Sequence, residues 1–597
     1  MPVGRYAEIS GSALPRLWRC FNMWKIYRRL KSHSLQITWI IAFEFLQSLT
    51  DLYLPTIMSD IINDGIMKED VDYIVHEGLY MLLISGCGVT CALLARLLSS
   101  KVMAGFGREL RNNIFEHVES FSLGEFDRFG SSTLVTRTTN DVMQIQTVTI
   151  IILNMILHAI VMCIGGVILA YSKDQRLTIL LLIVLPLVAA IIYLIARFVI
   201  PLFRQVQKKV DKLNLILSEN LKGIRVIRAF NREAHAKKRF AQANGDLTNT
   251  YIKVNRILAI LMPTVTMLME TLIVGLLWFG AIRVDESKMD LGALIAFLQY
   301  AMQIMFALVM VTIMFIMIPR GQAAADRINE VLETKPSIRN LPGAHSADFE
   351  RGFVEFDHVT FRYQGAEEPA LKDVSFKAKP GETTAIIGGT GSGKSTLVNL
   401  IPRFYEPESG RVLVDGVDVR EFPQEQLRAK IGFVPQTAVL FTGSVADNLR
   451  YGRENADEKE LLHAAQVAQA SDFISEMEDG FNTMLSEGGL NLSGGQKQRL
   501  AIARAIVRKP EIYVFDDSFS ALDFKTDANL RAALRKEMGD ATVIIVAQRV
   551  GSIMNADRII VLDEGAIVGI GTHRELLDTC KIYREIVSSQ LTKEEIA

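Results

Sequence analysis

The 597-residue sequence predicts two joined parts, an α-helical membrane domain of six spans followed by an α/β domain. Long apolar runs fill the first half, whereas short β-rich runs alternate with helical segments after about Gly352. The chain is too long for one hydrophobic core. Its content of hydrophobic residues, 49 %, is high for a soluble protein of this size.

Six apolar stretches reach the roughly 20 residues that a helix needs to cross a bilayer. They are residues 35–61, 78–98, 148–171, 177–199, 257–281 and 291–318. The connections after the second and fourth stretches are long, and the others are short. Helical spacing of apolar residues within the long connections predicts that the spans continue as helices beyond the bilayer.

The distribution of basic residues predicts how the chain is oriented in the membrane. The connection at residues 200–256 is rich in lysine and arginine, and such loops stay in the cytoplasm. We therefore expect a multi-pass protein of the cell membrane with its amino terminus and everything after Arg320 in the cytoplasm. The net charge of −1 does not suggest nucleic-acid binding. The five cysteines are scattered without paired metal spacing, which favours a reduced compartment.

The amino-terminal segment carries aromatic residues at helical spacing among basic ones. The aromatic residues are Trp18, Phe21, Trp24 and Tyr27. This pattern predicts an amphipathic helix on the membrane surface, and a mobile basic tail is the alternative.

A phosphate-binding loop is predicted where the β-rich run 383–387 meets a glycine-rich segment. That segment reads Gly388-Gly389-Thr390-Gly391-Ser392-Gly393-Lys394-Ser395, followed by Thr396 in a helix. Its backbone N–H groups can wrap phosphates. Lys394 is expected at the β- and γ-phosphates of ATP, and Ser395 on Mg²⁺. The alternative is a glycine-rich turn without a ligand.

Two further segments fit a nucleotide site. The apolar run 512–516 ends in Asp516, which is expected near the metal. The segment Leu492-Ser493-Gly494-Gly495-Gln496 precedes a helix and forms a second anion site. A chain with its own phosphate loop does not need this second site for the same nucleotide. We expect it to meet ATP held by another subunit.

With these motifs the chain resembles the ATP-binding cassette (ABC) exporters over nearly its whole length. The resemblance implies that Tyr363 stacks on adenine and that Gln436 contacts the metal and the γ-phosphate. It also implies that residues 492–496 are the family signature, that residues 520–523 lie at a dimer interface, and that residues 124–129 and 218–223 form coupling helices.

The resemblance also implies a domain organisation. We expect an amino-terminal segment at residues 1–33, a transmembrane domain at 34–325 and a linker at 326–351. An ABC-type nucleotide-binding domain is expected at 352–590 and a tail at 591–597.

Two catalytic positions depart from the family pattern. Asp517 stands where the family usually has glutamate, and Gln548 stands where it usually has histidine. The aspartate carboxylate sits about 1.5 Å further back, and displacements near 1 Å can cost about 10²-fold in rate. Glutamine can donate a hydrogen bond but has no ionisable ring. The chain thus resembles the weak-site subunit of heterodimeric exporters, with neutral drift as the alternative.

The predicted function is ATP-driven export of lipophilic or amphipathic compounds, with a second half-transporter, membrane lipids and small-molecule cargo as partners. Alternatives are a homodimeric exporter or lipid flippase, and a non-pumping channel or regulatory subunit. Glu270 lies nearest the centre of a span. An acid at that depth faces either cargo or a hydrogen-bond partner on another helix, and both readings stay open.

Overall fold

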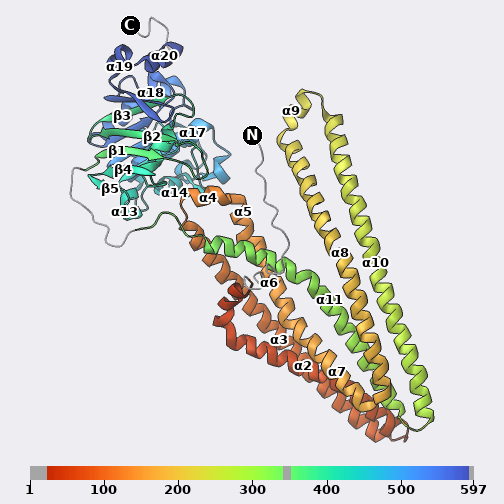
Figure 1. Ribbon diagram of the computed structural model, residues 1–597. Coiled ribbons are helices and arrows are strands. Elements are labelled where there is room, and N and C mark those ends of the chain that lie inside the picture. Colours follow the sequence, from red (N-terminus) through yellow and green to blue (C-terminus); the bar gives the residue numbers. More distant parts are fainter. Residues whose placement is uncertain (1–22, 341–350, 591–597) are drawn as a thin grey trace. The chain divides into compact units, whose positions relative to one another are not determined.

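The computed structural model describes residues 23–340 and 351–590 (Figure 1). The chain forms two compact units. One comprises Met1–Glu119 and Ser132–Thr334, and the other comprises Ser120–Ser131 and Lys335–Ala597. The short segment Ser120–Ser131, taken from the first long connection, therefore belongs to the second unit. Trp18 and Phe21 of the predicted surface helix lie outside the described residues, whereas Trp24 is exposed.

Long helices make up the first unit, and the six predicted apolar stretches fall on them. These helices are α2 (Ser34–Asp60), α3 (Val71–Glu119), α6 (Val142–Ile151), α7 (Leu157–Lys173), α8 (Gln175–Lys222), α10 (Glu233–Asp285) and α11 (Leu291–Glu333). At 1.5 Å per residue, α3, α8 and α10 are each about 70–80 Å long, more than twice the thickness of a bilayer core. The predicted helical membrane domain with long extensions is confirmed.

Four helical segments among the described residues are long and apolar enough to cross a membrane. They are Val71–Glu119, Ser131–Lys173, Glu233–Asp285 and Leu291–Val311. The first and fourth predicted spans are absent from this set. The first lies on α2, whose sequence includes Glu44 and Asp51. The fourth lies on α8, where the apolar segment found is the shorter Gln175–Ile191.

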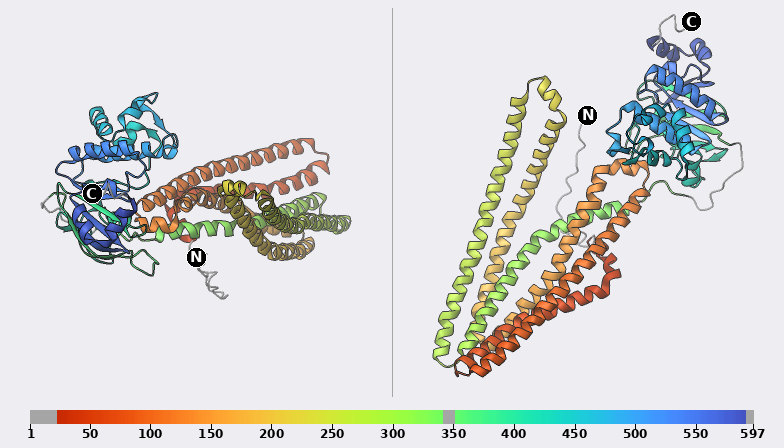
Figure 2. Two further views of the ribbon diagram at one scale, coloured as in Figure 1. Left: turned by 90° about the horizontal axis from the view of Figure 1, so that it is seen from above. Right: turned by 180° about the vertical axis from the view of Figure 1, so that it is seen from behind.

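Helix α11 packs at the centre of the membrane unit. Phe297, Tyr300 and Ile304 of α11 are fully buried in one core with Leu181 of α8 and Leu276 of α10. The Tyr300 hydroxyl lies 2.7 Å from Thr56 Oγ1 on α2, so the buried ring has a polar partner. Helices α8 and α10 run side by side as a hairpin that is closed by α9 (Ile224–Ala229), as Figures 1 and 2 show.

A buried carboxylate joins helices α8 and α10 at the point where α7 ends. Asp174 lies between α7 and α8, and its side chain is only 2 % exposed. Asp174 Oδ1 accepts hydrogen bonds from the backbone N–H groups of Arg176 and Leu177 at the start of α8. Asp174 Oδ2 accepts from Arg283 Nε on α10 at 2.5 Å. The carboxylate therefore caps one helix and pairs with another.

The second unit contains two sheets. A four-stranded antiparallel sheet has the order β2-β1-β4-β5, and a six-stranded sheet has the order β12-β11-β3-β10-β9-β6. In the larger sheet, β3, β6, β9, β10 and β11 are parallel, and only β12 is antiparallel. The strands are β1 (Val354–Phe361), β2 (Leu371–Ala378), β3 (Thr383–Gly388), β4 (Ser409–Val414), β5 (Val417–Asp418), β6 (Ile431–Val434), β9 (Ile512–Asp516), β10 (Thr542–Val546), β11 (Arg558–Asp563) and β12 (Ala566–Gly571).

Two short strands and several helices complete this unit. The strands are β7 (Gly443–Ser444) and β8 (Met484–Leu485). The helices are α4 (Leu123–Phe129), α12 (Lys394–Leu400), α13 (Gln424–Ala429), α14 (Val445–Arg450), α15 (Glu458–Val467), α16 (Ser471–Ser475), α17 (Gly494–Arg508), α18 (Phe524–Met538), α19 (His573–Thr579) and α20 (Lys581–Gln590). The predicted α/β domain is confirmed.

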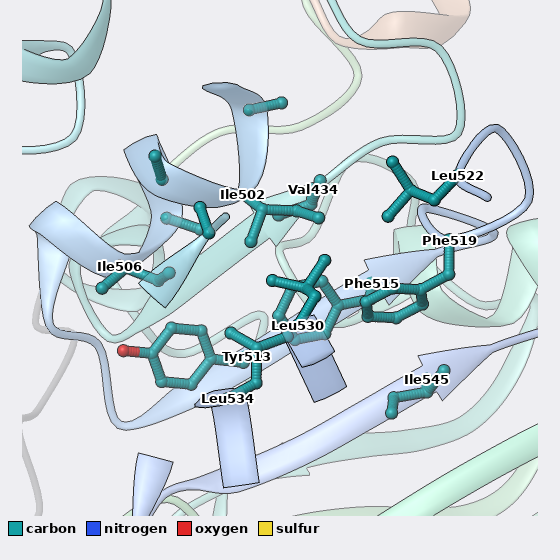
Figure 3. Packing of buried hydrophobic residues seen from close by; sticks show 14 of the residues in the cluster. Val434, Ile502, Ile506, Tyr513, Phe515, Phe519, Leu522, Leu530, Leu534 and Ile545 are labelled. Carbon is teal, nitrogen blue, oxygen red and sulfur yellow. The ribbon is translucent and has the colours of Figure 1, made fainter. Parts of the chain in front are cut away.

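Strand β9 is buried on both faces, and its side chains alternate between two cores. Tyr513 and Phe515 pack with Ile502 of α17 and Leu530 of α18, as Figure 3 shows. Ile512 and Val514 face the opposite core, which the antiparallel sheet shares. A parallel strand that is buried on both faces needs apolar side chains at successive positions, which explains why residues 512–515 are all apolar.

We predict that Asp174→Ala destabilises the membrane unit by on the order of 3 kcal/mol, because it leaves the Arg283 guanidinium without its partner and α8 without its cap. The measurement is the thermal unfolding midpoint of the purified chain in detergent. Glu286→Ala is the matched control, since it removes an exposed ion pair with Lys288. Equal midpoints for the two variants would contradict the role given to Asp174.

Candidate nucleotide site

The glycine-rich loop between β3 and α12 has no room for side chains at two positions. A Cβ at Gly388 would lie 2.1 Å from the carbonyl oxygen of Leu562 on β11. Gly393 has φ +96°, and a Cβ there would lie 2.7 Å from the carbonyl oxygen of Ala370. Glycine is therefore required where the loop leaves the sheet and where it enters the helix.

Lys394, the first residue of α12, lies against this loop. Its Nζ donates hydrogen bonds to the carbonyl oxygens of Gly388 at 2.9 Å and Gly389 at 2.7 Å. Burial lowers the pKa of the Lys394 ammonium, and the carboxylates of Asp517 and Asp516 oppose this effect. The ammonium thus lies at the loop with two acids beside it.

The two predicted metal ligands from distant segments are adjacent. Ser395 Oγ donates to Asp516 Oδ1 at 3.0 Å. Asp516 ends β9, whose register places it opposite Val546 of β10, and β10 in turn pairs with β3. Burial raises the pKa of Asp516, and the hydrogen bond from Ser395 partly offsets the rise. No cluster of three or more His, Cys, Asp or Glu side chains that could hold a metal occurs within the described residues.

Asp517 follows β9 and is held by two glutamine side chains. Gln548 Nε2 donates to Asp517 Oδ2 at 2.9 Å, and Gln436 Nε2 lies 3.3 Å from the same oxygen. Asp517 is buried, and its φ of +48° lies in the left-handed region. The three predicted catalytic residues therefore meet at one carboxylate oxygen, although they lie on three separate segments of the chain.

Gln590 supports Gln548, and no motif in the sequence pointed to it. Gln590 lies at the end of α20, where its Nε2 donates to the Gln548 carbonyl oxygen at 2.8 Å. Its Oε1 accepts from the backbone N–H of Val550, also at 2.8 Å. The side chain of Gln590, at the end of α20, thus holds the loop that carries Gln548. The sequence around Gln590 contains no motif that would predict this role.

Tyr363, the predicted adenine-stacking residue, is 39 % exposed. Its hydroxyl lies 3.0 Å from Thr396 Oγ1, so it is tied to the helix that follows the phosphate loop. The ring of Tyr405 packs against Tyr363 edge to face, with centroids 5.5 Å apart. Sequence reasoning did not find Tyr405.

The signature segment (residues 492–496) forms the start of α17. Ser493 is the N-cap: its Oγ accepts from the Gln496 N–H at 3.3 Å, and Gln496 Oε1 accepts from the Ser493 N–H at 2.8 Å. Ser493 and Gly494 are exposed, whereas Gly495 and Gln496 are half-buried. Among the described residues, no recorded hydrogen bond joins this segment to the phosphate loop of the same chain.

Comparison with known proteins identifies the family. Models of the ABC transporter transmembrane region and of the ABC transporter match residues 37–308 and 371–520. A Mycobacterium tuberculosis protein named as an uncharacterized ABC transporter ATP-binding protein is 45 % identical over 94 % of this chain and 96 % of its own length. A Bacillus subtilis protein with the same kind of name is 38 % identical over 96 % of this chain and 99 % of its own length.

Two further relatives extend the comparison. The ATP-dependent lipid A-core flippase of Chromobacterium violaceum is 29 % identical over 96 % of this chain and 99 % of its own. A solved structure of a bacterial Atm1-family ABC exporter with ATP bound superposes with a TM-score of 0.79 at 26 % identity, covering 95 % of this chain and 99 % of that one.

The membrane helices and the ATP-binding domain in one chain define an ATPase coupled to transport. The chain belongs to the ABC transporter family and has the architecture of an exporter half, with a transmembrane domain fused to an ABC domain that binds ATP. Exporters of this family act as dimers.

We predict that Lys394→Ala weakens ATP binding by this chain, because the β- and γ-phosphates lose their main charge partner. The measurement is photolabelling of the chain with 8-azido-ATP over a range of concentrations. Lys379→Ala, which removes an exposed lysine of the same domain, is the control. Unchanged labelling of the Lys394 variant would defeat the assignment of this loop.

Proposed function

We propose that this chain is one half of a heterodimeric exporter of lipophilic or amphipathic compounds, working by alternating access, and that its own ATP site is catalytically weak. The observation that carries the proposal is the environment of Asp517. Its Oδ2 already accepts hydrogen bonds from Gln548 and Gln436. These two bonds occupy Oδ2, so only Oδ1 is left to face an attacking water, and the aspartate side chain is one methylene shorter than the glutamate usual at this position, which draws that oxygen back from the water.

ATP is proposed to bind between Tyr363 and the loop at residues 388–396. Mg²⁺ is proposed to bind Ser395, Asp516 and Gln436. The donor set suits it, because Mg²⁺ prefers hard oxygen ligands, and Ser395 Oγ and Asp516 Oδ1 already lie 3.0 Å apart. The metal would neutralise charge on the phosphates. Ser395 and Asp516 would hold it, and Lys394 would orient the phosphate chain.

Two exposed surfaces support a second chain as partner. The signature segment presents Ser493 and Gly494 to solvent, so it can close on a nucleotide held by another cassette. The tip of the α8–α10 hairpin presents Val226 and Phe230, which are 61 % and 74 % exposed. Large apolar side chains at the tip of a long extension are typical of an interaction surface. The basic residues near this tip support a cytoplasmic location.

The nature of the cargo is supported by the membrane unit and by one relative. Spans five and six are rich in methionine, which suits adaptable apolar contacts. The Chromobacterium relative is named as a flippase of a lipid. A homodimeric exporter or lipid flippase is the second candidate, and this relative is the observation that favours it. A non-pumping channel or regulatory subunit has no such observation in its favour.

The two ATP sites of the proposed heterodimer should respond differently to mutation. Asp517→Ala should reduce ATP turnover by well under the 10²–10⁴-fold expected on loss of a well-placed base. Ser493→Arg should nearly abolish turnover, because bulk and charge enter the phosphate site completed for the partner. The measurement is steady-state ATPase activity of the purified complex.

Asn455→Arg is the control for Ser493→Arg, since it adds the same group to another exposed loop. Each variant must first co-purify with the partner. A homodimer of this chain with brisk ATPase activity that Asp517→Ala silences would show that Asp517 is a competent base, and it would overturn the asymmetric assignment.

Glu270 is the proposed cargo-facing acid. It is exposed on α10, and no hydrogen bond or ion pair of its side chain is recorded among the described residues, which disfavours a structural bond within this chain. Glu270→Gln should lower transport of a lipophilic cation several-fold and leave a neutral analogue of similar size little changed, because only charge is removed. The measurement is uptake into inside-out vesicles. An equal decrease for both compounds would exclude the cargo role.

A further inference from the structure

A group of polar side chains lies inside the part of the membrane unit that the sequence predicts to cross the bilayer. Glu44, Ser48 and Asp51 recur at intervals of four and three residues along α2, so they lie on one side of that helix. Ser48 Oγ is 3.0 Å from Nδ1 of His158 on α7. Gln303 on α11 donates from Nε2 to the Asp51 carbonyl oxygen at 3.1 Å. We refer to these five residues of three helices as the polar cluster.

Apolar residues surround the polar cluster. The residues that directly follow three of its members, Leu52, Ala159 and Ile304, are buried in the hydrophobic core of the membrane unit. Bulk water cannot hydrate polar groups in such surroundings, so each of them depends on partners within the protein or on a ligand. The hydrogen bonds of the cluster therefore show which of its atoms still have capacity for a ligand.

The atoms of the cluster without a recorded partner are hydrogen-bond acceptors. Ser48 Oγ donates to the Glu44 carbonyl oxygen at 2.8 Å. Because a hydroxyl has one hydrogen, Ser48 accepts in its contact with His158, whose Nδ1 carries the hydrogen. Oε1 of Gln303 is buried and has no hydrogen-bond partner among the described residues. A ligand of the cluster must therefore donate hydrogen bonds or carry positive charge.

Glu44 is the member of the cluster that most needs a ligand. The residue is only 3 % exposed, and no hydrogen bond or ion pair of its side chain is recorded in the part of the chain that the structure describes. Arg96 of α3 attracts a charge on Glu44, and Asp51 repels it. His158 of α7 interacts with both of these charged groups, and α11 contributes the uncharged Gln303. An anion without a hydrogen-bonded partner is costly within a span.

Burial favours a proton over a larger ligand at Glu44. A metal ion needs several protein ligands, and no group of three or more His, Cys, Asp or Glu side chains that could hold one occurs within the described ranges. An organic ammonium group would need a cavity beside the carboxylate, whereas protein atoms cover 97 % of this residue. A proton needs no cavity, since it adds to one carboxylate oxygen.

We propose that Glu44 is a reversible proton-binding site inside the membrane unit. The proton comes from water, forms an O–H bond at a Glu44 carboxylate oxygen and leaves the side chain neutral. Its release to water restores the carboxylate, so no further reactant is required. The bound proton lets α2 pack against α7 and α11 without an unpaired anion. The site is separate from the proposed ATP site, and its test requires neither ATP nor cargo.

The test is infrared spectroscopy of the purified full-length chain in lipid nanodiscs, titrated from acid to alkaline pH. A protonated carboxyl group has a C=O stretching band that shifts in heavy water and disappears on ionisation. Glu44→Gln should remove one such band from the spectrum at neutral pH. Glu286→Gln is the matched control and should leave that band unchanged, because Glu286 is exposed and paired with Lys288.

The charges near Glu44 give the titration of this band a signature. Asp51→Asn removes a repelling charge and should move the midpoint of the titration to lower pH, by on the order of one pH unit. Arg96→Gln removes an attracting charge and should move the midpoint to higher pH by a similar amount. Lys101→Gln removes another exposed cation of α3 and should move it little.

A second measurement uses only the wild-type chain, so it decides the question even if Glu44→Gln does not fold. Dicyclohexylcarbodiimide reacts with protonated carboxyl groups in apolar surroundings. Mass spectrometry should find its adduct on the peptide that contains Glu44, in amounts that fall as the pH rises. An infrared band that Glu44→Gln leaves unchanged, the absence of this adduct, or midpoint shifts of one sign for Asp51→Asn and Arg96→Gln would each overturn the proposal.

Discussion

The parallel pairing of β3, β10 and β9 is the constraint on which the nucleotide site depends. Residues of a parallel sheet that are far apart in sequence reach the same edge at the carboxyl ends of their strands. The phosphate loop leaves β3, Asp516 ends β9 and Asp517 follows it, and Gln548 follows β10. The two cores on either face of β9 keep this register, because sliding the strand by one residue would exchange its two sets of side chains.

The contacts among Gln436, Asp517 and Gln548 are the basis of the proposal that an intact ATP-binding loop accompanies weak hydrolysis in this chain. In this proposal, ATP binding depends on the loop, Lys394 and Ser395, which follow the common pattern. Hydrolysis would depend on the Asp517 carboxylate, which is one methylene shorter than the usual glutamate and has one oxygen, Oδ2, engaged by two amides. A chain can keep ATP binding and an intact signature segment without an efficient catalytic base of its own, provided that a partner chain supplies the base at the other ATP site.

Local sequence rules were enough for much of this structure. Three features could be predicted from short windows of about 20 residues. They are the phosphate loop, from the glycine spacing at residues 388–395, strand β9, from its apolar run, and the long helices, from their apolar stretches. Gln590 and Tyr405 carry none, because Gln590 contacts Gln548, and Tyr405 contacts Tyr363 and Asp127, all of which lie 42 or more residues away along the chain. The assignment of Ser120–Ser131 to the second unit could not be foreseen for the same reason, since it reflects packing rather than periodicity.

The most direct test of the weak-site assignment is the chemical state of the nucleotide on each chain during turnover. The purified complex is incubated with 8-azido-ATP labelled in the α-phosphate, irradiated during steady-state hydrolysis, and separated into its two chains for analysis of the bound nucleotide. The account predicts mainly intact triphosphate on this chain and mainly diphosphate on the partner. Equal proportions of diphosphate on both chains would contradict it.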